Sequence, residues 1–110
     1  RLALNQPDQF TFTPVTGVAS NTTYTSNTIT LSGSGFSGGT ATLTGTGATF
    51  SINGGSYTTG SVTVANGDTI TVRVISTTVA GGTRTGTVNV AGTIGAYSVT
   101  RAGNFFGGGM

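Results

Sequence analysis

Short glycine-containing turns divide the middle of the chain into segments in which hydrophobic and polar residues alternate. Residues 50–58 alternate around a glycine turn at 53–55, and residues 61–74 alternate around an Asn-Gly pair at Asn66 and Gly67. A period of two places successive side chains on opposite faces of a strand, and Asn-Gly favours a hairpin turn with positive φ at both central positions. This pattern predicts an antiparallel β module.

The same alternation recurs along most of the chain and defines seven to eight short strands. Thr, Ser or Asn stand between the hydrophobic residues in nearly every segment, so one face of each strand is expected to be buried and the other exposed. Glycine-rich turns separate the segments at intervals of about eight to twelve residues, as in sheet sandwiches. We therefore predict an all-β sandwich of two antiparallel sheets, with a central strand at residues 69–74. The hydrophobic positions that define the strands are Phe10, Phe12, Ile29, Leu31, Ala41, Leu43, Phe50, Ile52, Val62, Val64, Ile70, Val72, Val74, Val88, Val90, Tyr97 and Val99.

Composition indicates one folded domain. We predict a single domain over residues 1–110, with a core at about 7–101, an N-terminal arm at 1–6 and a glycine-rich C-terminal tail at 102–110. Charged residues make up only 5% of the chain, which argues against disorder maintained by charge repulsion. The formal net charge of +2 is too small to favour nucleic-acid binding, and no apolar run reaches the roughly 20 residues of a membrane span.

Residues 7–12, 24–33, 51–55 and 66–69 resemble a bacterial immunoglobulin-like repeat, and the resemblance extends over about residues 7–101. It implies an immunoglobulin-like antiparallel β-sandwich. Modules of this family occur in tandem in large bacterial surface proteins, and related ones occur on phage virion proteins, where they act as spacers, adhesive stalks and decorations. The resemblance implies no catalytic residue.

From this resemblance we expect a non-catalytic structural module of a virion surface, such as a phage head decoration or tail component. Its implied partners are neighbouring subunits or the parent particle, in a homo-oligomeric assembly. The alternative is an extracellular adhesin or stalk module of a bacterial cell surface, with a glycan as a candidate ligand.

The side chains that most enzymes use for catalysis are scarce. His, Cys, Lys and Glu are absent from the chain, and the two carboxylates, Asp8 and Asp68, are far apart in sequence. We predict a protein that is not an enzyme and has no cofactor. Calcium needs about six to eight oxygen ligands, usually including several carboxylates. We therefore predict no metal site and assign Asp68 to a turn in which it accepts hydrogen bonds from nearby backbone N–H groups.

Residues 33–38 match the G-x-G-x-x-G pattern, which binds pyrophosphate when a helix follows it. Residues 40–44 instead alternate like a strand, and no acidic residue stands about 20 positions further on. We predict a flexible loop between strands at this position rather than a nucleotide site.

Tyr57 and Arg73 are the candidate surface contacts. Tyr57 is next to a glycine turn and is the aromatic residue best placed to stack on a sugar, but packing against a neighbouring strand is an alternative role. Arg73 lies between Val72 and Val74 and is expected on the exposed face of its strand. There it either contacts a partner or remains a solvated charge that discourages edge pairing.

The two ends of the chain depart from the sandwich pattern. Leu2 and Leu4 precede the first strand, and Phe105 and Phe106 lie in a tail that ends in three glycines and a methionine. Adjacent Phe residues are poor candidates for permanent exposure. We therefore name these four side chains as candidates for docking onto a neighbouring subunit, and a disordered terminus is the alternative.

Overall fold

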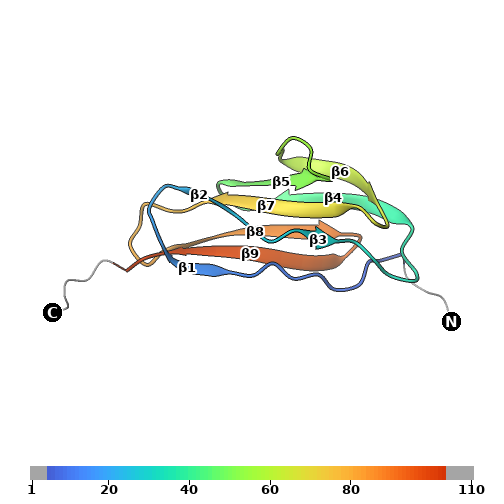
Figure 1. The fold of residues 1–110 in the computed structure, drawn as a ribbon, viewed down its shortest axis with the longest axis horizontal. Coiled ribbons are helices and arrows are strands. Elements are labelled where there is room, and N and C mark those ends of the chain that lie inside the picture. Colours follow the sequence, from blue (N-terminus) through green and yellow to red (C-terminus); the bar gives the residue numbers. More distant parts are fainter. Residues whose placement is uncertain (1–4, 104–110) are drawn as a thin grey trace.

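The computed structural model describes residues 5–103, and in this range the protein is all-β, with nine strands in two sheets and no helix (Figure 1). Seven of the eight segments defined by alternation contain or overlap one of these strands. The strands are β1 (Val15–Val18), β2 (Thr23–Thr25), β3 (Ile29–Thr30), β4 (Gly38–Thr44), β5 (Ala48–Ile52), β6 (Gly60–Ala65), β7 (Thr69–Ile75), β8 (Thr83–Val90) and β9 (Thr93–Arg101). β1 and β2 were not predicted, so the expected count of seven to eight strands is too low.

One sheet has five strands in the order β1-β9-β8-β4-β6. In the other sheet β7 is central, with β5 on one side and β2 followed by β3 on the other. All pairs of strands are antiparallel except β1 with β9, which is parallel. The predicted purely antiparallel arrangement is therefore wrong at this one edge.

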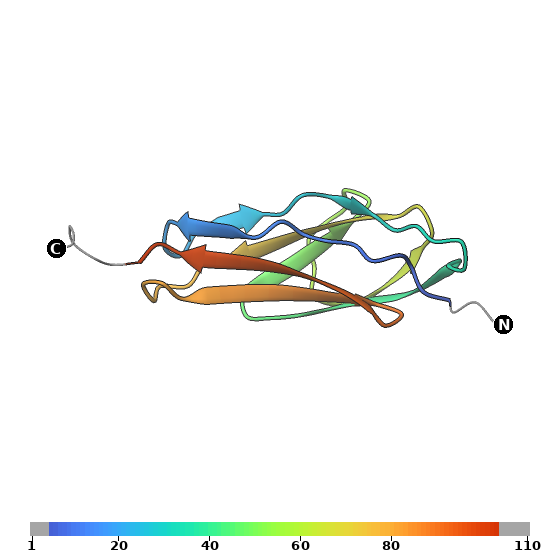
Figure 2. The ribbon, with the colours of Figure 1, turned by 90° about the horizontal axis from the view of Figure 1, so that it is seen from below.

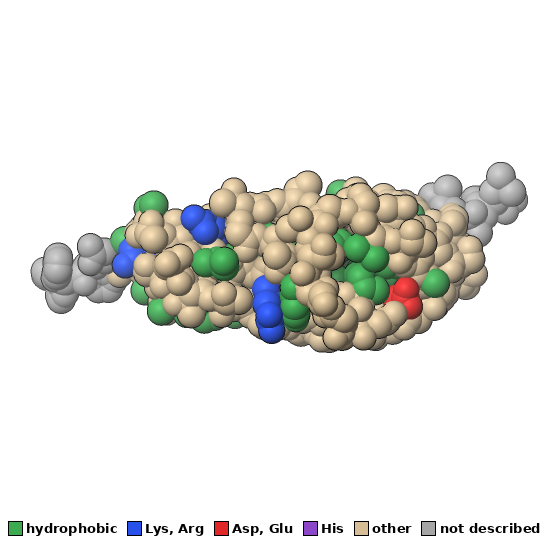
Figure 3. Space-filling model, turned by 90° about the horizontal axis from the view of Figure 1, so that it is seen from above, with side chains coloured by type: hydrophobic (Ala, Val, Ile, Leu, Met, Phe, Trp, Pro, Cys, Tyr) green, Lys and Arg blue, Asp and Glu red, His purple; other side chains and the backbone are tan. Residues whose placement is uncertain are grey.

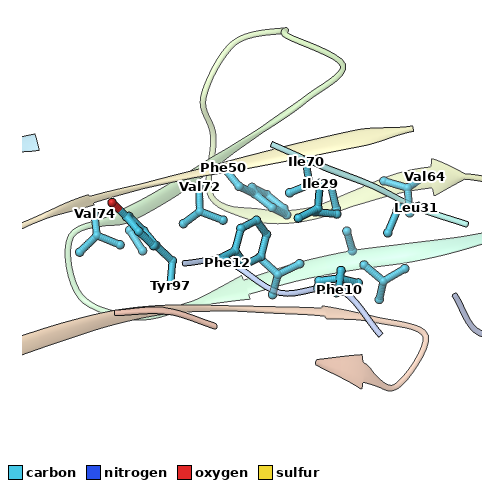
Figure 4. Packing of buried hydrophobic residues seen from close by; sticks show 14 of the residues in the cluster. Phe10, Phe12, Ile29, Leu31, Phe50, Val64, Ile70, Val72, Val74 and Tyr97 are labelled. Atoms are coloured by element: carbon cyan, nitrogen blue, oxygen red, sulfur yellow. The ribbon is translucent and has the colours of Figure 1, made fainter. Parts of the chain in front are cut away.

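The two sheets face each other, and hydrophobic side chains from both meet between them (Figure 4). On β7 the residues predicted to be buried, Ile70, Val72 and Val74, are fully buried, while Arg73 is exposed. The predicted register of this central strand is confirmed. The buried hydrophobic residues are Phe10, Phe12, Ile29, Leu31, Phe36, Ala41, Ala48, Phe50, Val64, Ile70, Val72, Val74, Val88, Val90, Tyr97 and Val99.

The strand predicted at Phe10 and Phe12 is absent, although both side chains are buried. Their rings pack edge to face, with centroids 6.0 Å apart. Polar side chains take the place of a ladder here: the Asn27 amide accepts a hydrogen bond from the backbone N–H of Thr13 and donates one to the carbonyl of Thr11. The hydrophobic pattern predicted burial correctly, because burial needs an extended chain but no paired strand.

β2 and β3 are separated by a bulge at Ser26. Between the pairs Thr25–Arg73 and Ile29–Ile70, one side of the ladder contains one residue more than the other. The buried Ser26 donates its backbone N–H to the carbonyl of Val72, and its hydroxyl accepts the N–H of Val72 at 2.9 Å. One side chain thus satisfies a backbone group that the bulge would otherwise leave unpaired.

The two Asn-Gly turns differ in conformation. Asn53 and Gly54 both have positive φ, 54° and 74°, as a type I′ hairpin requires. At the second Asn-Gly pair only Gly67 has positive φ, 95°, so the expected positive φ at both positions is wrong there. The reason is that the chain does not return along β6 as a hairpin, since β6 and β7 belong to different sheets.

The described domain is elongated, with extents of 59 × 30 × 17 Å. The strands run along the long axis, and the described chain begins at one end of that axis and finishes at the other (Figures 1 and 2).

Candidate functional site

Tyr57 and Arg73, which are 16 positions apart in the sequence, lie side by side on the outer face of the smaller sheet. The loop after β5 positions Tyr57: Phe50 and Thr58 exchange two backbone hydrogen bonds of 2.9 Å each, so the loop folds back along the free side of β5. The hydroxyl of Ser51 donates to the carbonyl of Gly55 at 2.8 Å and fixes the turn before it. Tyr57 is therefore held by backbone pairing.

Arg73 is held from two sides. Its guanidinium carbon lies 3.9 Å from the centroid of the Tyr57 ring, and its Nε donates to the hydroxyl of Thr25 on β2 at 3.3 Å. Stacking of a guanidinium on an aromatic face is favourable by about 0.5–1 kcal/mol at an exposed site. The side chain consequently lies flat across β7, with Tyr57 on one side and Thr25 on the other.

The surroundings of this pair are hydroxyl-rich. Thr71, predicted to be exposed, is half-buried, and its hydroxyl lies 2.6 Å from that of Thr28. Ser51 and Thr49 face Thr71 and Arg73 across the β5–β7 ladder. Chemically, the arrangement can present guanidinium N–H donors and hydroxyl groups to a polar ligand. The ring face of Tyr57 that meets Arg73 is not available for stacking on a sugar.

Asp68 joins the turn after β6 to the turn after β5. Its carboxylate accepts the side-chain N–H of Asn53 at 3.0 Å and the backbone N–H of Ala65 at 2.8 Å, and Asn53 in turn accepts the N–H of Thr69. The Asn53 hydrogen bond and then the Ala65 hydrogen bond lower the pKa of Asp68 below its usual range, against a smaller opposing effect of burial. The predicted role of Asp68 in a turn is confirmed.

The segment with the G-x-G-x-x-G pattern leads into β4, as its alternation predicted. It is more constrained than the predicted flexible loop. Phe36 is buried in the core, and the Asn66 amide donates to the carbonyls of Gly33 and Phe36 at 3.1 and 2.7 Å. The side-chain Oδ1 of Asn5 also accepts the backbone N–H of Ser37 at 2.9 Å. These bonds direct the polar groups of the segment inward, toward the protein.

The candidate docking residues Leu2, Leu4, Phe105 and Phe106 lie outside the described residues. Within residues 5–103 there is no cavity or cleft, and no group of three or more His, Cys, Asp or Glu side chains capable of holding a metal. The same range contains no helix of a length and hydrophobicity that could cross a membrane.

Charged groups are few and scattered. In the space-filling view, basic and acidic side chains are separated by broad areas of uncharged polar surface (Figure 3). Arg84 and Arg101 donate to backbone carbonyls, of Ile75 at 3.2 Å and of Thr78 at 3.0 Å. Arg84 therefore ties β8 to the end of β7, and Arg101 ties β9 to the loop that follows β7.

Sequence reasoning missed the buried hydroxyls. Ser76 is fully buried, accepts the N–H of Thr22 at 3.0 Å and donates to the carbonyl of Ala19. Ser26 plays the equivalent role in the bulge. The sequence offered one signal for the buried hydroxyl of Ser76, which is that Ser76 directly follows the alternating residues 69–75. That signal is weak, because most serines at the ends of strands are exposed.

Comparison of the chain with protein-family models, with curated proteins and with solved structures finds no match in any of the three.

Proposed function

We propose that the domain is a non-catalytic structural module of a virion surface, such as a phage head decoration or tail component, built on an immunoglobulin-like sandwich. One observation carries the proposal: side-chain amides and hydroxyls at several places along the described residues brace the fold. The amides of Asn5, Asn27 and Asn66 tie loops to other segments. Hydroxyl pairs link neighbouring strands, as at Thr83 with Thr100 and Thr85 with Ser98. Such bracing favours a rigid element over a site with free functional groups.

The strand order supports the immunoglobulin-like assignment. In the constant-type order, one sheet holds strands A, B, E and D and the other holds C, F and G. Here β2–β3, β7 and β5 correspond to B, E and D, and β4, β8 and β9 correspond to C, F and G. Two strands depart from that order. β1 pairs with β9 instead of joining the sheet of B, E and D as strand A does, and β6 follows β5 in the chain but returns to pair with β4.

A second candidate is an adhesin or stalk module on a bacterial cell surface. The specific observation in its favour is that the described chain runs from one end of a 59 Å long axis to the other. When the chain enters a module at one end and leaves it at the other, each module extends a tandem array by most of its own length. The Arg73 and Tyr57 pair, with its surrounding hydroxyls, supplies the surface on which such a module would meet a glycan.

Immunogold labelling tests the proposal and separates the two candidates. Antibodies raised against the folded domain are applied to purified virions and to intact cells from the source of the protein. The proposal predicts gold particles on the virion surface. Labelling confined to the cell surface contradicts it in favour of the stalk module, and labelling of neither surface contradicts both.

A further inference from the structure

The four sheet edges of the described domain differ in how well they are protected. An unprotected edge presents unpaired backbone N–H and C=O groups that can pair with another strand. Proteins protect edges with prolines, bulges, charges or covering segments. The comparison of the four edges therefore shows where a second chain could add.

Three of the edges are protected. β1 follows Pro14, and its register with β9 shifts between Val15 and Val18. The edge formed by β2 and β3 is broken at Ser26 and covered by the Asn27 side chain, which bonds Thr11 and Thr13. The free side of β5 is occupied by the backbone of Thr58.

β6 is the exception. It pairs with β4 through six consecutive residue pairs without a shift, and it contains neither proline nor a charged residue. Within residues 5–103, residues 60–64 make no hydrogen bond outside the ladder with β4. Gly60, Ser61, Thr63 and Ala65 are exposed, and Val62 is half-buried.

The surface around β6 is compatible with contact between identical copies. β6 lies along the upper edge in Figure 1, and Figure 3 views the molecule from that side. It shows hydrophobic side chains among uncharged polar ones, with a few separate basic and acidic side chains on the same face. No basic residue of the described domain lies on β6, because Arg73 is on β7, Arg84 on β8 and Arg101 on β9. Two copies can therefore pair along β6 without placing these positive charges on the paired strands. An antiparallel strand pair is also self-complementary about a two-fold axis.

We infer that β6 is an assembly edge that pairs antiparallel with β6 of a second copy of this chain, joining two five-stranded sheets into one. The inference rests on the proposed structural function, because it names the partner of that module. A six-residue strand pair is small compared with a standard interface of about 1,600 Å². The contact is therefore weak in dilute solution and becomes populated where copies are held close together on a surface.

Sedimentation equilibrium of the full chain, up to about 1 mM protein, tests the inference. The wild type is expected to show a monomer–dimer equilibrium. Thr63→Lys places a charge on the exposed edge and is expected to weaken dimerisation by at least about tenfold. Thr87→Lys is the matched control: Thr87 lies on the outer face of the same sheet but on the inner strand β8, and this variant should dimerise like the wild type.

A disulfide test complements the charge variants. The chain has no Cys, so any cross-link in Thr63→Cys or Ser61→Cys comes from the introduced thiol. Under mild oxidation at least one of these variants should form a covalent dimer, and Thr87→Cys should not. This readout also covers the case in which Thr63→Lys fails to fold.

A monomeric wild type overturns the inference, as does equal weakening by the two lysine variants, which would indicate contact through the sheet face. Cross-linking of Thr87→Cys in place of the β6 variants overturns it as well. If the wild type is monomeric yet the antibodies still label virions, the edge inference fails and the proposed function stands.

Discussion

Ala91 is a residue whose backbone conformation conflicts with its side chain. It has a φ of 52°, and with Gly92 at 98° it forms the tight turn between β8 and β9. A left-handed conformation costs an L-residue about 1–2 kcal/mol, and Asn tolerates it better than Ala. We expect Ala91→Asn to raise the free energy of unfolding by about 0.5–1 kcal/mol, measured by urea denaturation.

The neighbouring glycine is the control for this prediction. A Cβ at Gly92 would lie 2.6 Å from the Gln6 amide nitrogen, and its φ of 98° disfavours a side chain. Gly92→Ala should therefore lower stability. If Ala91→Asn also lowers stability, the left-handed turn is wrong.

Gly95 is a second residue at which the structure leaves no room for a side chain. It lies within β9 and is buried against Phe10. A Cβ here would lie 2.5 Å from a ring carbon of Phe10 and 2.9 Å from its carbonyl oxygen. We expect Gly95→Ala to lower the free energy of unfolding by about 1–3 kcal/mol.

A double variant tests whether the Phe10 ring causes the loss of stability expected for Gly95→Ala. If the loss comes from the Phe10 ring, Gly95→Ala combined with Phe10→Leu should cost less than the sum of the two single changes. Strict additivity in thermal or urea denaturation would show that the ring and the glycine do not interact.

At the scale of the elements, β7 carries the largest part of the core. Val72 is fully buried in this central strand, whereas Thr71 points to the opposite face. Val72→Asp should bury an unpaired charge and cost several kcal/mol, while Thr71→Asp should be mild. Equal thermal midpoints for the two variants would refute the register of β7.

The turn after β6 depends on an ionised carboxylate. The pKa of Asp68 is lowered in the folded state, first by the Asn53 hydrogen bond, so folding favours the charged form. Its contribution to stability is therefore present above the unfolded pKa of about 3.8 and is lost as pH falls through the lower folded value. Asp68→Asn should flatten the acid limb of a stability–pH profile, and an unchanged limb would contradict this role.

The alternation of the sequence predicted the central strands and also β3, β5 and β6, but it missed β1 and β2 and wrongly predicted a strand at Phe10 and Phe12. Alternation at residues 69–74 or 88–90 reports burial on one face, and burial dominates the energy of a central strand. The chain around Phe10 has the same alternation, yet its backbone at Thr11 and Thr13 is satisfied by the Asn27 side chain, which lies 16 and 14 positions away in the sequence. Such long-range hydrogen bonds leave no periodic signal in the sequence.

For the candidate site, the sequence indicated the residues but not their contact. Tyr57 and Arg73 were chosen separately, one for its turn and one for its exposed strand position. Their stacking requires the loop after β5 to fold back onto Phe50 through Thr58, and that backbone pairing depends on tertiary structure. The roles of Ser26 and Ser76 depend equally on a bulge and a buried loop that local patterns do not encode.

At the scale of the whole molecule, the domain is a long, two-layered body with a largely uncharged surface and braced loops. These features support a function performed by contact between proteins. If neighbours cover part of the surface in the assembled state, the backbone amides beneath them become protected from exchange with solvent.

Hydrogen–deuterium exchange tests the proposed structural role most directly, by comparing the isolated domain with the same chain on the particle or cell surface that the antibodies label. If the proposed role holds, a continuous surface region gains protection on assembly, with residues 60–65 of β6 among those most affected. The central strands β7 and β8 should be slow to exchange in both states. Identical exchange profiles in the two states would contradict the proposed role, since a structural module must contact its neighbours.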